Sequence, residues 1–181
     1  MSRSSFSTEG IVLARKNYGE ADRLLTIFSR HYGKIFLLAK GVRKPKSRKR
    51  GHIEIFSRVR FSFAKNDNFV LMNEAELIDS YQQIRTNLKK ATLSYYFVEV
   101  ITKIIPGEEK HEELYNKLIE YLQHLKSSSK LKLLRLNFVE EVLVLLGYWP
   151  RGKVFMDADR VLDAVLERQI NSKRVGEKIL H

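Results

Sequence analysis

The sequence predicts an α+β protein in which a five-stranded β-barrel is followed by a bundle of α-helices. From residue 8 to residue 81, short β-branched and aromatic segments alternate with turn residues, which is typical of consecutive strands. After residue 81 the apolar residues recur at helical spacing, about every 3.6 positions. We therefore expect a barrel domain in residues 1–81 and a helical domain in residues 82–181.

Five strands are expected in the N-terminal half. The fourth shows the clearest alternation, because Val59, Phe61 and Phe63 are separated by Arg60 and Ser62. Five short strands in so short a segment indicate a small closed barrel, and the OB-fold is the leading candidate. The expected strands are residues 11–15, 24–29, 34–39, 53–64 and 69–80.

Helices are expected in the second half, and each has a sequence signal for its end. Pro106 and Gly107 stop the first, three consecutive serines stop the second, and Gly147 stops the third. The third is apolar on almost every side, which predicts that it is the central, buried helix of the bundle. The expected helices are residues 84–105, 111–126, 131–146 and 159–170.

The composition excludes several kinds of chemistry. The chain has no cysteine, so disulfides, thiolate nucleophiles and cysteine-bound zinc are excluded. The five histidines are too scattered to suggest a metal cluster, and no phosphate-binding glycine loop or hydrolase motif is found. No apolar run reaches the ~18 residues of a membrane span, and the N-terminus does not look like a signal peptide. We expect a cytoplasmic protein that is not an enzyme, binds no cofactor or metal and does not bind a membrane.

The positive charge is concentrated at one end of the chain. The formal net charge is +12, and residues 1–60 hold 15 Lys and Arg against 4 Asp and Glu, whereas residues 61–181 hold 18 against 17. Such asymmetry points to a polyanionic partner, namely nucleic acid, an anionic membrane surface or an acidic protein tail. The alternative is a well-solvated surface.

The densest cationic run is residues 40–50, with seven cations and no acid in eleven residues. Mutual repulsion makes such a run unfavourable unless a polyanion relieves it, and each neutralised phosphate releases condensed counterions. The alternative is a flexible loop that is only solvated. The predicted principal phosphate ligands are Arg43, Lys44, Lys46, Arg48, Lys49 and Arg50, and the predicted flanking contacts are Arg15, Arg23, Lys34 and Lys40.

Aromatic residues suggest two further kinds of site. Tyr18 and Tyr32 stand at turns of the barrel and are the candidates for exposed base-stacking platforms, whereas aromatics such as Phe28, Phe61 and Phe63 alternate with polar residues and are interpreted as core. The helical half has more aromatics than a small bundle needs, and a hydrophobic groove edged by cations would suit an acidic, hydrophobic-ended peptide. Ordinary core with a solvated face is the alternative. The cations considered for this groove are Lys89, Lys90, Lys103, Lys117, Lys132 and Arg135.

Four segments resemble the RecO family of recombinational-repair mediators. They are EGIVLAR at residues 9–15, YGEADRLLTIF at 18–28, AKGVRKPKSR at 39–48 and LLGYWP at 145–150. The resemblance implies an OB-fold followed by a helical domain, no catalytic residues, and binding of single- and double-stranded DNA with annealing of complementary strands. It also implies contact with the C-terminal tail of single-stranded DNA-binding protein, cooperation with RecR to load RecA, and a location at the bacterial nucleoid. Many members carry a four-cysteine zinc module after the position of Pro150; this chain has no cysteine there, and zinc is not expected.

The function expected from all of this is that of a mediator of DNA repair and recombination. The basic barrel would hold DNA by its phosphates and reduce the repulsion between two strands, which leaves the base edges free to pair. One rival is an RNA-binding OB-fold protein, which competition between DNA and RNA oligomers would distinguish. The other is a small nucleoid-associated structural protein, which would bind DNA without annealing it.

Overall fold

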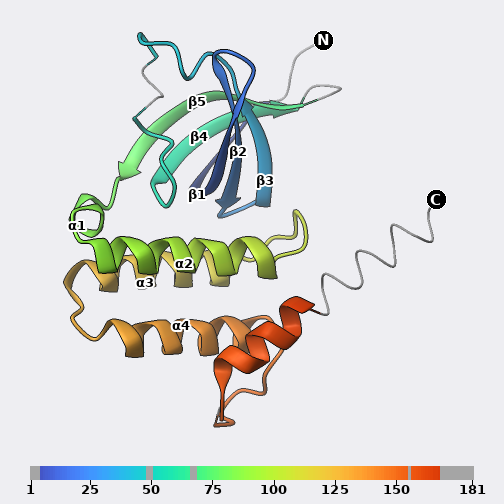
Figure 1. The fold of residues 1–181 in the computed structure, drawn as a ribbon. Coiled ribbons are helices and arrows are strands. Elements are labelled where there is room, and N and C mark those ends of the chain that lie inside the picture. The colour runs from blue at the N-terminus through green and yellow to red at the C-terminus, as the bar shows by residue number, and fades with distance from the viewer. Residues whose placement is uncertain (1–4, 48–50, 66–68, 155, 168–181) are drawn as a thin grey trace.

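The computed structural model describes residues 5–47, 51–65, 69–154 and 156–167 of the 181 in the chain. A β-barrel lies on a layer of helices (Figure 1). α2 (Leu88–Ile104) runs beneath the barrel, α4 (Leu131–Leu145) lies on the side of α2 away from it, and α3 (Glu112–Ser127) runs behind them. A short α1 (Gln82–Arg85) connects the barrel to α2, and a last helical segment covers residues 158–167.

The barrel is closed in the order β1-β2-β3-β5-β4. All neighbouring strands are antiparallel except β3 and β5, which are parallel. This mixed five-stranded barrel followed by helices confirms the expected α+β fold, and the strand order is that of an OB-fold. The strands are β1 (Ser5–Tyr18), β2 (Asp22–Ser29), β3 (Gly33–Ala39), β4 (Arg58–Lys65) and β5 (Val70–Asp79).

The fourth strand is shorter than its alternating sequence predicts, because it begins at Arg58 and not at Ile53. The residues before it turn back, and Phe56 adopts a positive φ of 55°. Its amide donates to the carbonyl of Val12 at 2.7 Å, and the guanidinium of Arg85 lies 3.8 Å from the centre of its ring. Ile53 faces the barrel core, whereas Phe56 packs toward the helices. The apolar residues before Arg58 therefore belong to two different cores and do not form part of the strand.

The predicted first helix is divided in two. α1 ends at Arg85, and α2 begins after Asn87, whose side chain accepts a hydrogen bond from the amide of Lys90 at 3.2 Å. Such a cap satisfies an amide that has no partner within the helix, so Asn87 starts a new helix.

The central helix is α2, and the prediction that α4 would occupy this place is wrong. α2 buries seven residues, including Phe97 and Ile101, whereas α4 buries four. Leu133 of α4 is 53% exposed. The reason is that α2 packs against the barrel on one side and against α3 and α4 on the other, whereas α4 lies on the outside of the helical layer.

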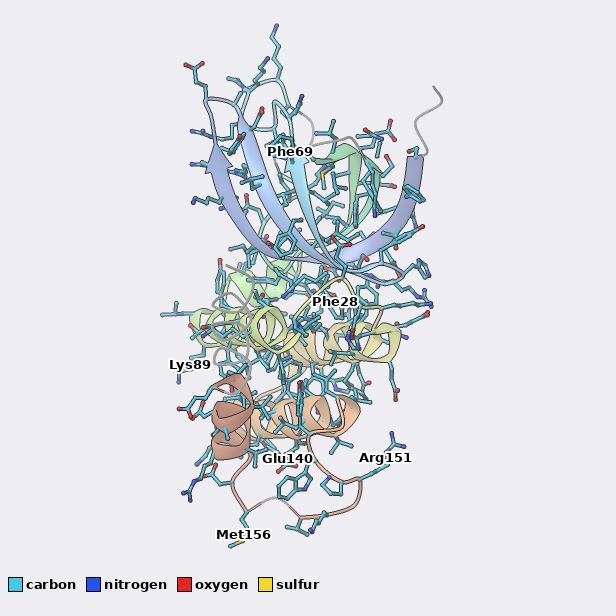
Figure 2. The ribbon with its side chains drawn as sticks, turned by 90° about the vertical axis from the view of Figure 1, so that its right-hand side faces the viewer. Phe28, Phe69, Lys89, Glu140, Arg151 and Met156 are labelled. Carbon is cyan, nitrogen blue, oxygen red and sulfur yellow. The ribbon has the colours of Figure 1, made fainter. Side chains whose placement is uncertain are left out.

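One of the two hydrophobic cores is shared by the barrel and the helices, and the other fills the barrel. Ile11, Leu13 and Phe28 of the barrel belong to the same buried cluster as Phe97 and Tyr115 of the helices. Figure 2 shows Phe28 at the boundary between the two layers, where its ring meets that of Tyr115 edge to face at 5.8 Å. The boundary expected after residue 81 stays a prediction, but the shared core means that each layer would expose apolar surface without the other.

Polar contacts fix the barrel on the helices at several points. Arg30 of the barrel donates to Glu112 of α3 at 3.0 Å, and Asp79 at the end of β5 accepts from Lys126 of α3 at 2.6 Å. Within the barrel itself, Glu9 of β1 accepts from Arg58 of β4 at 2.8 Å. Within the described part of the chain, no helix has the length and apolar character needed to cross a membrane.

Candidate nucleic-acid interface

The basic loop, residues 40–50, begins at the end of β3, and its first residues are fixed to the turn between β1 and β2. The amide of Gly41 donates to Oδ1 of Asp22 at 2.7 Å. The amide of Arg43 donates to the carbonyl of Ala21 at 2.8 Å, and its guanidinium donates to the carbonyl of Gly19 at 3.1 Å. Two connections far apart in sequence are therefore one structural unit at this end of the barrel.

Two consecutive turns shape the loop after this anchor. The amide of Lys44 donates to the carbonyl of Gly41 at 3.1 Å, and the amide of Ser47 donates to the carbonyl of Lys44 at 2.9 Å. Gly41 has a φ of 64°, which an L side chain adopts only with strain, so glycine suits this tight reversal. The turns hold Lys44 and Lys46 away from the barrel, and both side chains are exposed.

The predicted principal phosphate ligands differ in what the structure says of them. Lys44 and Lys46 are exposed, whereas Arg43 is half-buried against the β1–β2 turn. Lys40, predicted as a flanking contact, is also exposed and directly precedes them. The remaining three predicted ligands lie outside the described residues. They are Arg48, Lys49 and Arg50.

Arg15 and Arg23 lie on β1 and β2 and share one acidic partner. The guanidinium of Arg15 forms an ion pair with Glu54, and Nη1 of Arg23 lies 3.9 Å from the same carboxylate. Arg23 also donates to the side chain of Asn17 at 3.4 Å. Glu54 belongs to the connection between β3 and β4, so these two cations are already partly neutralised by the segment that follows the basic loop.

Lys34 lies apart from the other predicted cations. Its side chain is 7% exposed, and Nζ donates to the carbonyl of Thr102 at 2.8 Å and to the carbonyl of Ile105. Carbonyls at the C-terminal end of a helix lack partners within the helix and carry a partial negative charge. The ammonium of Lys34 therefore fastens β3 to the end of α2, and we leave it out of the proposed DNA interface.

The exposed aromatic residues of the barrel are not all those the sequence singled out. Tyr18 and Tyr32 are exposed, at 45% and 38%, but the ring of Tyr32 rests edge-on against Phe63 at 5.3 Å. Two aromatic residues that were not among the candidate platforms are more open than Tyr32: Phe36 is 58% exposed and Phe69 is 44% exposed. Strand parity could have identified Phe36, since Ile35 and Leu37 on either side of it face the barrel core.

The helical half contains a basic groove of about 550 Å³ beside the start of α4. Leu131, Leu133 and Leu136 supply its apolar part, and Leu133 is 53% exposed. The groove cations are Lys89, Lys130 and Lys132.

The other cations considered for this groove have partners elsewhere. Arg135 makes two hydrogen bonds to Asp159, at 2.6 and 2.7 Å, and Lys90 donates to the carbonyl of Lys126 at 2.7 Å. Lys103 and Lys117 form ion pairs with glutamates. Of the six cations named from sequence, only Lys89 and Lys132 line the groove.

A second cleft of about 550 Å³ lies between α3, α4 and the segment after Pro150. Glu140 of α4 and Arg151 both line it, so its charge is mixed (Figure 2). Among the residues described, no three or more His, Asp or Glu side chains come together in a way that could hold a metal ion.

A closed five-stranded barrel with a cationic loop at one end defines an OB-fold protein, a class that binds oligonucleotides on its outer face and loops. Two known protein families match the chain. The family described as "Recombination protein O N terminal" matches residues 1–81, and "Recombination protein O C terminal" matches residues 85–154. The chain therefore belongs to the RecO family of DNA repair and recombination proteins, which are mediators and not enzymes.

Several similar proteins carry the name DNA repair protein RecO. That of Pelotomaculum thermopropionicum is 32% identical over 145 residues, which cover 80% of this chain and 56% of that protein. That of Moorella thermoacetica is 34% identical over 146 residues, covering 81% and 54%. That of Thermoanaerobacter sp. strain X514 is 34% identical over 149 residues, covering 80% and 58%. The chain thus spans little more than half the length of these relatives.

Proposed function

We propose that this chain binds single- and double-stranded DNA by its phosphates and anneals complementary strands as a mediator of recombinational repair. The observation that carries the proposal is the basic loop, whose first residues are hydrogen-bonded to the β1–β2 turn. This anchor keeps Lys40, Lys44 and Lys46 together at one end of the barrel. A fixed group of exposed cations loses little conformational entropy when it binds a polyanion.

Electrostatics favour phosphate as the ligand of this loop. Within the part of the chain that the structure describes, no carboxylate forms an ion pair with the ammonium groups of Lys40, Lys44 and Lys46. Arg15 and Arg23, in contrast, form ion pairs with Glu54. Contacts to phosphates carry no sequence information, which suits a protein that must act on any damaged sequence. Annealing follows because a cation surface that binds two strands lowers their repulsion while the base edges stay free.

The protein partners belong to the same proposal. The groove beside α4 combines three lysines with three leucines, of which Leu133 is exposed, and this combination suits an acidic peptide with an apolar end. We assign to it the C-terminal tail of single-stranded DNA-binding protein. Cooperation with RecR, and through it the loading of RecA, rests on membership of the family.

The dependence of DNA affinity on salt tests the phosphate contacts. We expect the triple variant K40Q/K44Q/K46Q to bind a single strand more weakly than the native chain. The slope of log K against log salt should become shallower by about 2, because each phosphate contact on a single strand contributes about 0.7. The matched control is K103Q/K110Q/K153Q, which removes the same charge from the helical half.

The control triple variant should keep nearly the native slope. A folded K40Q/K44Q/K46Q variant with an unchanged slope would contradict the proposed interface. A loss of equal size in both triple variants would mean that net charge, and not this loop, attracts the DNA.

A further inference from the structure

The outer face of β1, β2 and β3 carries a set of side chains that the phosphate contacts do not explain. Leu25, Ile27, Ile35 and Leu37 face the barrel core, so the residues between them point outward. Strand pairing then places outward residues side by side. These pairs are Thr26 with Phe36, Leu24 with Leu38, Leu24 with Lys16, and Asp22 with Tyr18.

β5 brings a further aromatic residue to this face. Leu38 pairs with Leu71 of β5, and Phe69 lies two residues before Leu71. The ring centres of Phe69 and Tyr18 are 6.5 Å apart, with 58° between the ring planes. Figure 2 shows Phe69 on the barrel, above Phe28 at the helical layer.

Three aromatic rings on this face are open to solvent. Phe36 is 58% exposed, Tyr18 is 45% exposed and Phe69 is 44% exposed, whereas Phe28 on the same face of β2 is covered by Tyr115. A single exposed aromatic residue is ordinary, but several on one sheet face mark a binding surface.

The charges around this face indicate an anionic ligand. Lys16 is exposed on the same face of β1, and Lys40 follows the end of β3. The outer face of β4 and β5 is different, because it presents Glu74 and Glu76 to solvent and its Arg60 is paired with Glu76 at 3.3 Å. A polyanion is therefore attracted to one side of the barrel and repelled from the other.

We propose that the outer face of β1, β2 and β3 is a base-stacking platform for unpaired nucleotides, formed by Tyr18, Phe36 and Phe69. This inference rests on the proposed DNA binding and names the form of DNA that this face takes. Bases of a duplex are already stacked on each other, so only an unpaired strand can place its bases on protein rings. A base that stacks by its face keeps its pairing edge free, so a stacked strand remains ready to anneal.

The test compares single and double strands bound to the full chain. We expect Phe36→Ala to weaken binding of a labelled oligothymidine of about 16 nucleotides roughly tenfold, with little change for a duplex of equal length. Phe36→Tyr should keep the affinity, because the ring remains. Tyr148→Ala is the matched control, since Tyr148 is an exposed aromatic residue after α4 and should leave both affinities unchanged.

An abasic oligonucleotide of the same length supplies a second measurement. The native chain should bind it at least as weakly as Phe36→Ala binds the normal strand, because the abasic strand offers no base to any of the three rings. On the abasic strand itself, Phe36→Ala and the native chain should have equal affinity. Circular dichroism and thermal unfolding of each variant verify folding, and a side chain that is 58% exposed leaves no core cavity when it is truncated.

The outcomes separate this proposal from the one on which it rests. If the native chain binds neither DNA, the proposed function fails. If K40Q/K44Q/K46Q weakens binding but Phe36→Ala binds both DNAs with native affinity, or loses both equally, only the platform is overturned. A Phe36→Ala variant that changes sedimentation but not DNA affinity would also overturn it, since the face would then join two copies of the chain.

Discussion

The amide of Gly41 donates a 2.7 Å hydrogen bond to the carboxylate of Asp22. This bond joins the start of the basic loop to the first residue of β2, and Arg43 reinforces it through the carbonyls of Gly19 and Ala21. The placement of the loop cations thus depends on an acidic residue in the neighbouring turn.

Replacement of Asp22 should loosen this anchor. We expect Asp22→Ala to cost about 1 kcal/mol of unfolding free energy, which corresponds to about 2–4 °C in melting temperature for a chain of this size. Asp22→Asn should lose less, because its side-chain oxygen still accepts the bond from Gly41. Thermal unfolding followed by circular dichroism measures both, and equal melting temperatures for Asp22→Ala and the native chain would contradict the anchor.

We expect Glu54 to reduce the affinity for DNA. Its carboxylate pairs with Arg15 and lies near Arg23, so Glu54→Gln removes the acidic partner of Arg15. We expect tighter single-strand binding and a salt slope steeper by up to about 0.7, from one further phosphate contact through Arg15. Weaker binding by the folded variant would show instead that Glu54 orients these arginines for DNA.

Lys34 should matter for stability and not for DNA. Its ammonium donates to carbonyls at the C-terminal end of α2, and Lys34→Met would leave those buried acceptors unsatisfied. We expect a loss of about 1–3 kcal/mol in unfolding free energy, with native DNA affinity at temperatures where the variant stays folded. Denaturant unfolding and fluorescence anisotropy measure the two quantities; a native unfolding midpoint combined with weakened DNA binding would reverse the assignment.

Acid should weaken the attachment of β5 to α3. Burial alone raises the pKa of Asp79, but hydrogen bonds from Lys126, Gln123 and the amide of Tyr81 outweigh it and bring the pKa below its ordinary 3.8. A carboxylate with a lowered folded-state pKa stabilises the protein above its unfolded-state pKa, and this contribution is lost as the pH falls through the folded value.

The free energy of unfolding should therefore decrease once the pH drops below about 4, and protonation of Asp79 is one cause of the decrease. Asp79→Asn should be less stable than the native chain at neutral pH, and the difference should shrink with acidification. Urea unfolding across this pH range measures the effect, and a constant difference would argue against the ion pair as its source.

The peptide groove requires the full chain for its test. A fragment that begins near residue 82 would expose the apolar surface that Ile11 and Phe28 cover, so its failure to bind would be uninformative. We expect K132Q/L133A to weaken binding of an acidic tail peptide to the full chain by about tenfold or more, with K103Q as the control. Calorimetry that gives native affinity for the groove variant would exclude this site.

The strands were predictable where one local pattern decides their structure. β2 and β3 each differ from their expected bounds by one or two residues at the start, because each is a short apolar segment that follows turn residues. The prediction that the fourth strand begins at Ile53 was wrong because Ile53 and Phe56 belong to different cores. The central position of α2 also follows from long-range packing, since the barrel that covers it is formed by residues earlier in the chain.

The positive charge of the site could be predicted from the sequence, but the residues that pair with its cations could not. The exposed Lys44 and Lys46 lie where the density of cations indicated a loop. Arg15 and Lys34 have the same charge, but Glu54 and Thr102 neutralise or engage them from 39 and 68 residues further along the chain. No local pattern contains that information, whereas the alternation of sides along β3 could have shown that Phe36 is exposed.

Strand annealing without nucleotide is the most direct test of the central claim. Two complementary oligonucleotides carrying a fluorescent donor and acceptor are mixed with the full chain, K40Q/K44Q/K46Q or K103Q/K110Q/K153Q, with matched RNA as competitor. We expect the native chain and the helical control to accelerate pairing, the loop variant to do so much less, and RNA to compete no better than DNA. DNA binding without faster pairing, or equal acceleration by the folded loop variant, would contradict it.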